Sequence, residues 1–254
     1  MTRKTFLLIL SLVFVLTIAI RIFWYDNDYS NPLHFSQYPT YGYYEIYPET
    51  ILGSLNREVT EVFTPASDEI WNRGEQYDEA FHWSQSDYLM IANALSQEVW
   101  HESLDLEEWK VLYLSLDQSC EDNPQGFHTF SIVYFKNLGV EFWNRRYQAR
   151  LIEVYPWQGL IRWGDSTFSD DIKPGWGNAN LNEFKVTADG ALLITERNGG
   201  SEVRQEADNM CRISIRMNNY SPVTGYTNNN WLVEYGVADF YLLINPFTGE
   251  FKSK

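Results

Sequence analysis

The chain contains two cysteines, Cys120 and Cys211, which are the side chains with the most specific chemistry. In an exported protein an isolated cysteine pair forms a disulfide more often than a metal site, and this pair would close a loop of about 90 residues. Two buried free thiols are the alternative. We therefore predict a disulfide between Cys120 and Cys211, provided that this part of the chain lies outside the cytoplasm.

Motifs for metal binding or nucleophilic catalysis are incomplete. His101 and Glu102 match the beginning of a zinc-protease helix, but Asp105 stands where the second histidine ligand is needed. The sequence also contains neither a G-x-S-x-G elbow nor a phosphate-binding loop. Oxygen-bearing side chains alternate from Asp165 to Asp171, yet the glycine and the bidentate glutamate of a calcium loop are missing. We predict no metal and no cofactor.

Neighbouring carboxylates are the remaining catalytic candidates. Asp105, Glu107 and Glu108 are close enough in sequence to serve as a general acid and a general base. The same grouping is typical of any acidic surface, so it does not distinguish a catalytic pair from solvated side chains. No catalytic residue is therefore predicted.

Aromatic side chains make up 17% of the chain, with 10 Trp and 17 Tyr, which is enough for a surface that stacks on sugars or holds a peptide. Most of these rings are expected to belong to the core, as with Trp109 and Trp231 inside predicted strands. Trp157 and Trp176 fall in predicted loops instead. These two are the candidates for ligand contact.

The N-terminal segment has the pattern of a membrane helix. Two basic residues precede an uncharged run from Thr5 to Ile20, and the apolar character extends to Tyr25. A helix of this length spans roughly 30 Å, the thickness of a bilayer core. We predict that residues 1–25 are a membrane anchor, with a signal peptide cleaved after Thr17-Ile18-Ala19 as the alternative. Both interpretations place the chain from about residue 26 onward outside the cytoplasm.

Charge and targeting together limit the partners. The formal net charge of −15 makes the chain repel phosphate backbones, so we expect no binding to nucleic acid. The expected location is the cell membrane, with a single membrane pass and an extracytoplasmic C-terminal domain. The expected partners are the membrane itself, through the N-terminal helix, and a protein or peptide.

Periodicity beyond the anchor predicts helices and strands in a repeated order. Residues 26–82 are expected to form a stalk and an irregular lead-in, with an irregular strand at 41–47. A helix is predicted from N-cap candidates within Ser84-Gln85-Ser86-Asp87 to about Glu102, and another over 188–197, capped by Thr187 and stopped by 198–200. Strands are predicted from alternation over 109–116, 127–135, 147–154, 211–217, 231–235 and 240–244.

Two stretches echo each other. Ile152–Ile161 and Leu242–Phe251 both place an apolar strand before a turn in which Pro and an aromatic residue precede a polar residue and Gly. This echo indicates a duplicated unit. The predicted fold class is therefore α+β, with tandem units at 83–168 and 183–254, each a helix packed on a small antiparallel sheet, preceded by the transmembrane helix.

The second unit resembles a PepSY-type domain. The resemblance rests on the capped helix at Thr187-Ala188-Asp189-Gly190, on Trp231-Leu232-Val233, and on the final Ile244-Asn245-Pro246-Phe247-Thr248-Gly249-Glu250. It covers about 70 residues, Asn245 replaces the usual Asp, and the first unit matches in outline only. The resemblance implies a helix across a small antiparallel sheet, in an extracytoplasmic protein with a binding or inhibitory role and without catalytic residues.

These observations lead to one functional hypothesis and two alternatives. The chain is expected to be a membrane-anchored extracytoplasmic module that binds, inhibits or has a structural role, without catalysis. A cell-surface hydrolase using a carboxylate pair is the first alternative, because such pairs carry no motif. An accessory subunit of a membrane complex is the second, and an exposed apolar patch on the first unit would support it.

Overall fold

The computed structural model describes most of the chain beyond residue 33. The described residues are 34–55, 62–73, 77, 81, 83–104, 108–121, 127–141, 144–169, 180–218, 230–236 and 240–253. The chain divides into two units, Met1–Asn31 and Pro32–Lys254. The predicted anchor, residues 1–25, lies outside the described residues, and no helix within them is long and apolar enough to cross a membrane.

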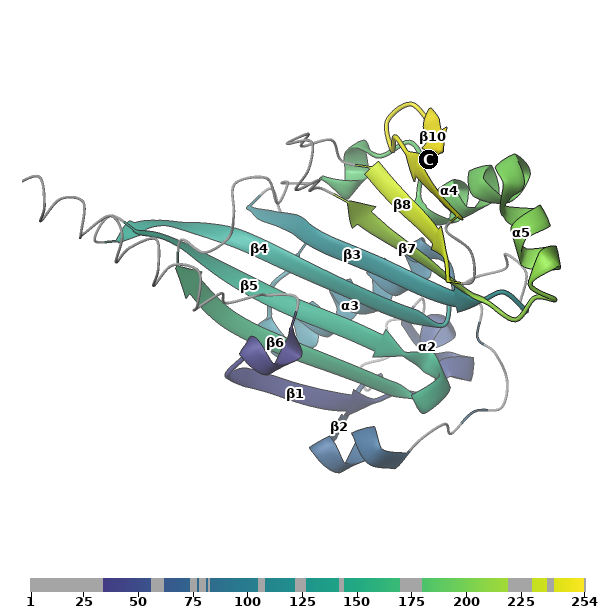
Figure 1. The fold of residues 1–254 in the computed structure, drawn as a ribbon. Coiled ribbons are helices and arrows are strands. Elements are labelled where there is room, and N and C mark those ends of the chain that lie inside the picture. Colours follow the sequence, from purple (N-terminus) through teal and green to yellow (C-terminus); the bar gives the residue numbers. More distant parts are fainter. Residues whose placement is uncertain are drawn as a thin grey trace, which may run out of the picture. The chain divides into compact units, whose positions relative to one another are not determined.

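The described strands form one antiparallel sheet of ten strands, in the order β10-β9-β8-β7-β3-β4-β5-β6-β1-β2 (Figure 1). The strands are β1 (Thr40–Glu45), β2 (Thr64–Ala66), β3 (Trp109–Ser119), β4 (Thr129–Glu141), β5 (Asn144–Tyr155), β6 (Leu160–Ser169), β7 (Arg212–Asn218), β8 (Asn230–Tyr235), β9 (Phe240–Ile244) and β10 (Phe251–Ser253). All six strands predicted from alternation are present, several of them longer than predicted.

Two meanders of four strands meet inside this sheet. Helix α3 (Gln85–Trp100) precedes β3 to β6, and α4 (Ala188–Thr195) with α5 (Ser201–Glu206) precedes β7 to β10. The meanders are joined edge to edge, because β3 and β7 pair from Ser115↔Arg216 to Ser119↔Arg212. The predicted α+β fold of two tandem units, each a helix on its own small sheet, is therefore wrong, and the described residues form mostly one continuous sheet. Pairing the two first strands satisfies backbone groups that two separate sheets would leave at open edges.

Residues before the first meander extend the sheet. Strand β1 pairs with β6 from Thr40↔Asp165 to Glu45↔Leu160, and β2 pairs with β1. Helix α2 (Pro48–Leu55) buries Ile51 in the main core. The irregular strand predicted at 41–47 corresponds to β1, whereas β2 and α2 lie in the segment expected as a stalk and lead-in, and β6 is not among the strands predicted from alternation.

Both Pro-aromatic turns connect the third and fourth strands of their meanders. Gly159 ends the turn Pro156–Gln158 between β5 and β6 with φ 60°, and Gly249 ends the turn after β9 with φ 78°. Glycine adopts positive φ without a steric penalty, which explains its place in both turns. The superposition of the two complete units stays a prediction.

The helix starts follow the predicted caps. The Ser84 hydroxyl accepts a hydrogen bond from the Asp87 amide at 3.2 Å, and the Ser84 amide donates to the Asp87 carboxylate at 2.9 Å, which completes a capping box for α3. Thr187 caps α4. The predicted stop after α4 is instead a kink, where a π turn over Glu196–Gly200 leads directly into α5.

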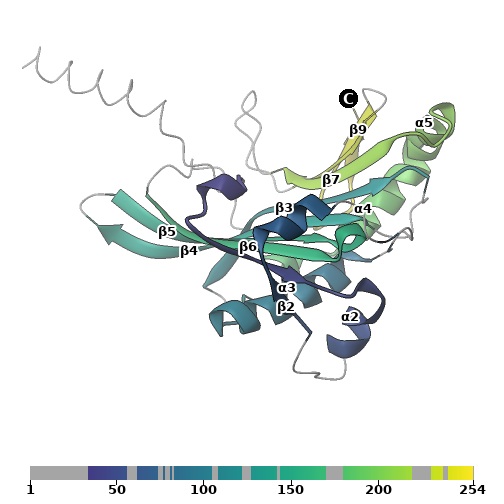
Figure 2. The ribbon, with the colours of Figure 1, turned by 90° about the horizontal axis from the view of Figure 1, so that it is seen from below.

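The main core lies between helices α2, α3 and α4 and one face of the sheet (Figure 2). Tyr88 of α3 stacks on Phe130 of β4 with ring centroids 5.0 Å apart, and its hydroxyl donates to the Phe127 carbonyl. A smaller cluster lies on the opposite face, beneath the 3-10 turn η1 (Phe35–Gln37), and includes the buried Tyr38. This second face carries none of the described α-helices (Figure 1).

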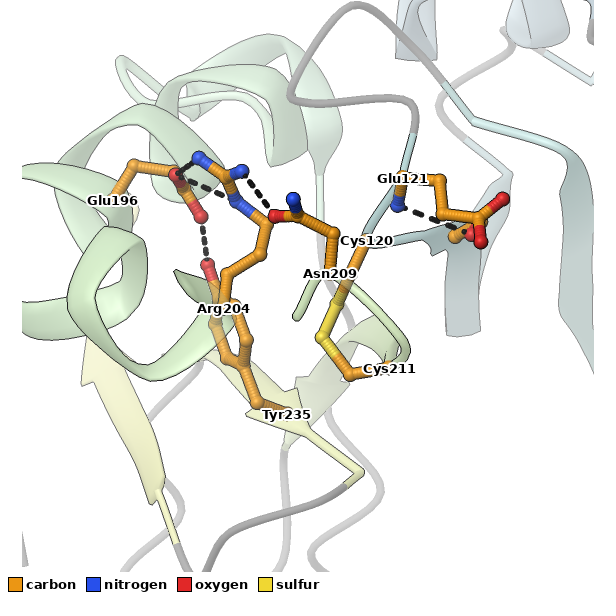
Figure 3. Close-up of a disulfide and its surroundings, with 8 residues drawn as sticks. Cys120, Glu121, Glu196, Arg204, Asn209, Cys211 and Tyr235 are labelled. Carbon is orange, nitrogen blue, oxygen red and sulfur yellow. Dashed lines mark hydrogen bonds and ion pairs between the residues drawn. A yellow bond between two sulfur atoms is a disulfide. The ribbon is translucent and has the colours of Figure 1, made fainter. Parts of the chain in front are cut away.

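The predicted disulfide is confirmed. Cys120 and Cys211 are bonded with a Cα–Cα distance of 5.0 Å, and the Cys120 amide donates to the Cys211 carbonyl at 2.9 Å (Figure 3). Cys120 follows β3 and Cys211 precedes β7, so the bond lies where the two meanders join. It fixes the two first strands to each other at one end.

Reducing this disulfide is expected to lower the free energy of unfolding by about 3–5 kcal/mol, because the bond closes a long loop in the unfolded chain. Denaturant unfolding of the full chain with and without a reductant measures the difference. The double variant Cys120→Ser/Cys211→Ser is the control, since the reductant should not change its midpoint. Equal stability of the reduced and oxidised wild-type chains would contradict the expectation.

On the second face, the Tyr38 ring packs directly against Gly164 of β6, where there is no room for a larger side chain. A Cβ at this position would stand 2.6 Å from the Tyr38 ring, so Gly164→Ala is expected to destabilise the fold by about 1–3 kcal/mol. Gly53 in α2 is the matched control, because a Cβ there meets nothing within 4 Å. Gly53→Ala should be neutral or stabilising by up to about 1 kcal/mol. Urea midpoints of both variants test the contrast, and equal effects would refute it.

Candidate functional site

Six aromatic side chains form a continuous band on the face of the sheet that carries no described α-helix. We call this band the aromatic strip. Its members come from η1, from β1, from the 3-10 helix η2 (Asp68–Arg73) and from the end of β5 with the turn that follows: Phe35, Tyr41, Tyr43, Trp71, Tyr155 and Trp157. Two contiguous ring groups within it meet at one charged side chain, Arg162 of β6.

One ring group is built by η1 and β1. Residues two apart in a strand share a face, so Tyr41 and Tyr43 lie side by side with ring centroids 6.1 Å apart. Phe35 packs against both, at 5.3 Å from Tyr41 and 5.9 Å from Tyr43. Phe35 is held over the sheet because Tyr38, after the same turn, is buried against Gly164.

The other ring group lies at the end of β5. Trp71 meets Tyr155 edge to face at 5.1 Å, and Tyr155 meets Trp157 at 6.3 Å. The turn that carries Trp157 is closed by Gly159, and the Tyr77 amide donates to the Trp157 carbonyl. Trp157, predicted as a ligand-contact residue, therefore stands at one end of the strip. Trp176, the other predicted residue, lies outside the described residues.

Arg162 joins the two ring groups. Its guanidinium lies 4.4 Å from the Phe35 ring centroid and 4.3 Å from that of Trp71. It also forms an ion pair with Glu153, its cross-strand partner on β5. Burial opposes the charge, yet the hydrogen bond and the negative charge of Glu153 raise the pKa of Arg162 above its usual value. With aromatic rings and a carboxylate around it, this guanidinium is structural and is not available to bind an anion.

Exposure separates the contact rings from the supporting rings. Tyr41 is 51% exposed and Trp71 is 36% exposed, whereas the other members are partly buried. Burial raises the pKa of Tyr155, and the charge of Glu153 raises it further, so this hydroxyl stays protonated. Chemically, the strip offers apolar ring surface and neutral hydroxyl groups without a nucleophile. Such a surface suits binding by stacking and burial.

The same face is polar in the C-terminal half of the sheet. Asp117 of β3 pairs with Arg212 of β7 at 3.0 Å, and Arg216 of β7 pairs with Glu234 of β8 at 2.8 Å. Both pairs are partly exposed to solvent. Exposed ion pairs of this kind are typical of a solvated surface, so the aromatic strip is the distinctive feature of this face.

Arg150 of β5 lies in the main core and has surroundings like those of Arg162, with two aromatic rings and a carboxylate next to its guanidinium. The Arg150 guanidinium lies 4.6 Å from the Trp100 centroid and 4.3 Å from that of Trp109, and it pairs with Glu102 and Asp165. Burial acts to raise the pKa of Glu102, but hydrogen bonds from Trp109 and Arg150 lower it below its usual value. A carboxyl group in this state is a poor general acid, and its role here is to neutralise a buried arginine.

A third polar cluster supports the helix kink. Arg204 of α5 donates to the Glu196 carboxylate at 2.9 Å and to the Asn209 side chain at 2.8 Å, and the Tyr235 hydroxyl donates to the same carboxylate (Figure 3). Glu196, Arg204 and Tyr235 are all buried. Because every charge in this group has a partner, the cluster explains the geometry of the kink and offers no free group for catalysis.

The remaining carboxylate candidates also have structural roles or are not described. Asp105 and Glu107 lie outside the described residues, and Glu108 forms an ion pair with Lys136. Burial raises the pKa of Asp189, whose carboxylate accepts a hydrogen bond from the Gln85 amide at the start of α3. Within the described part of the chain, no three His, Cys, Asp or Glu side chains are grouped as a metal site would require.

Comparison with protein-family models, curated proteins and solved structures gives no match. The PepSY-type resemblance therefore stays a prediction. The residues that carry it have clear structural roles: Trp231 and Val233 of β8 are buried, and the Trp231 indole donates to the Val186 carbonyl at 2.8 Å. Asn245 accepts hydrogen bonds from the amides of Phe247 and Thr248, which shapes the final turn.

Sequence reasoning missed most of the strip. The irregular strand predicted at 41–47 contains Tyr41 and Tyr43, but neither of them, nor Phe35, Trp71 or Arg162, is predicted as a site residue. The spacing of two tyrosines by two residues was a signal for one face of a strand. Nothing in the sequence indicated that η1 and η2 place their rings on either side of Arg162.

The Glu153–Arg162 pair is expected to hold the strip together. Glu153→Gln removes the charge that compensates a guanidinium whose side chain is only 19% exposed, so we expect a loss of about 2–4 kcal/mol in unfolding free energy. Glu234→Gln is the matched control, because it breaks a cross-strand pair whose side chains are 42% and 45% exposed. That change should cost about 0–1 kcal/mol. Urea unfolding measures both, and equal losses would show that the pair has no special role.

Proposed function

We propose that this chain is an extracytoplasmic binding module, anchored in the membrane by residues 1–25, that holds a protein or peptide partner on its aromatic strip and performs no catalysis. The observation that carries the proposal is the exposure of Tyr41 and Trp71 on a rigid sheet face without α-helical cover. Tyr and Trp are enriched at protein interfaces because they bury a large area at low conformational cost.

The contacts that hold the rings of the strip in place favour a binding role over a purely structural one. A buried core needs no exposed tryptophan, yet Trp71 remains partly exposed although Arg162 covers one side of its ring. Three separate elements, η1, β1 and η2, converge to place these rings next to one another. Rings held by a sheet and by an ion pair lose little freedom when a partner binds.

The hydrolase alternative has less support. Of the described carboxyl groups, Glu102 and Asp189 have shifted pKa values, and both shifts are explained by contacts within the fold. An accessory subunit of a membrane complex remains compatible with the proposal, since such a subunit would also need an exposed apolar surface on this half of the sheet.

Cross-linking on intact cells tests location and site together. A membrane-impermeant, amine-reactive cross-linker should give a protein adduct with the wild-type full chain. Tyr41→Ala/Trp71→Ala should reduce this adduct by about fivefold or more, because the double variant removes the most exposed rings of the strip. Both variants are compared at equal membrane abundance.

Val140→Ala is the matched control, because Val140 is 69% exposed and pairs with Arg145, at the end of the β4–β5 ladder opposite to Tyr155. Its adduct should equal that of the wild type. An adduct that forms only after permeabilisation would contradict the proposed location. An adduct that is equally strong with the double variant would contradict the proposed site.

A further inference from the structure

The surroundings of the aromatic strip are acidic. Among the described side chains of residues 34–55 and 62–72, which supply η1, β1, α2, β2 and most of η2, there are carboxylates but neither lysine nor arginine: Glu45, Glu49, Asp68 and Glu69. Three of these four are exposed. These carboxylates and the net charge of −15 favour the approach of a positively charged ligand over that of an anionic one.

Asp68 and Glu69 lie in the first turn of η2, the same short helix that carries Trp71. Burial raises the pKa of Tyr43, and Asp68 and Glu153 raise it further against the opposing effect of Arg162. At the other end of the strip, Tyr77 contacts the Trp157 backbone and packs against the position of Gly159. Burial raises the pKa of Tyr77 as well, and the charges of Glu49 and Glu45 add to that effect.

The fold already contains one example of the recognition that such a surface offers. Arg162 is held by two ring faces, those of Phe35 and Trp71, and by the carboxylate of Glu153. A guanidinium is attracted to the negative face of an aromatic ring and to a carboxylate at the same time. The exposed rings Tyr41 and Trp71, with Asp68 and Glu69 at the start of η2, repeat the same combination of groups toward the solvent.

We propose that the aromatic strip and its neighbouring carboxylates bind arginine or lysine side chains in an extended segment of a partner protein. This inference rests on the proposed function and specifies the chemistry of the partner. Neutral sugars would stack on the rings and donate hydroxyl hydrogen bonds to the carboxylates without charge attraction, and anionic polymers would be repelled by the carboxylates. A basic segment uses both features.

The proposal is tested with the full chain in detergent and with short synthetic peptides of alternating glycine and arginine. The arginine peptide should bind, and its citrulline counterpart, which has the same shape without the charge, should bind at least about fivefold more weakly. Binding of the arginine peptide should weaken as the salt concentration rises. Isothermal titration calorimetry measures each affinity.

Variants then locate the contact. Trp71→Ala, and separately Asp68→Asn/Glu69→Gln, should each weaken binding of the arginine peptide by about threefold to tenfold. Glu202→Gln/Glu206→Gln is the matched control, because it removes two exposed carboxylates from α5. The control should bind like the wild type, and unfolding midpoints confirm that each variant is folded.

Three outcomes would overturn the inference: no binding of the arginine peptide, equal binding of the citrulline peptide, or equal losses in the control and in the η2 variant. A cross-linked adduct that still depends on Tyr41 and Trp71 would then show that the strip binds a partner of different chemistry. If the arginine peptide does not bind and the cross-linked adduct does not depend on Tyr41 and Trp71, the strip is not a binding site. The two proposals can therefore fail separately.

Discussion

The pairing of β3 with β7 is the interaction on which the rest of the structure depends. It converts two meanders into one sheet, and the Cys120–Cys211 disulfide fixes one end of this pair. Helices α3 and α4 are tied across the same division, because the Gln85 side chain accepts from the Ala188 amide at 2.6 Å and the Gln85 amide donates to Asp189. The ladder, the covalent bond and the crossed helix caps together give the sheet one continuous core face, which leaves the opposite face available for binding.

Two neighbouring strands of that sheet each carry an arginine, and the same kinds of contact stabilise both guanidinium groups. Arg150 of β5 points into the main core and Arg162 of β6 points to the opposite face, and each lies between two aromatic rings with a carboxylate as counterion. A buried guanidinium loses hydration, and only rings and carboxylates in good geometry can compensate for it. In the core the Arg150 side chain is only 6% exposed. On the face without a described α-helix, the contacts around Arg162 leave the Trp71 side chain partly exposed to solvent. The same rings that stabilise Arg162 are therefore accessible to a ligand.

The sequence predicted local structure well and long-range pairing poorly. The caps at Ser84 and Thr187, six strands and the disulfide follow from side-chain chemistry within short windows. The joining of the two meanders into one sheet does not follow from short windows. Alternation predicts which residues lie on each face of a strand, but it does not predict which strands pair with each other. Strand β6 is not among the predicted strands, since its second half is rich in Ser, Thr and Asp that resemble a loop. Of the site, Trp157 was identified from its turn, whereas the strip needed η1 and η2 to be placed in space.

Preorganisation links the stability of the strip to its proposed use. Arg162 holds Phe35 and Trp71 at fixed positions through its ring contacts, and Glu153 holds Arg162. A partner that binds rings already held in place does not have to order them, so more of the contact energy appears as affinity. Changes at Glu153 or Arg162 should therefore affect folding and binding together. Tyr41 contributes less to the core because it is 51% exposed, so a change there should separate binding from folding.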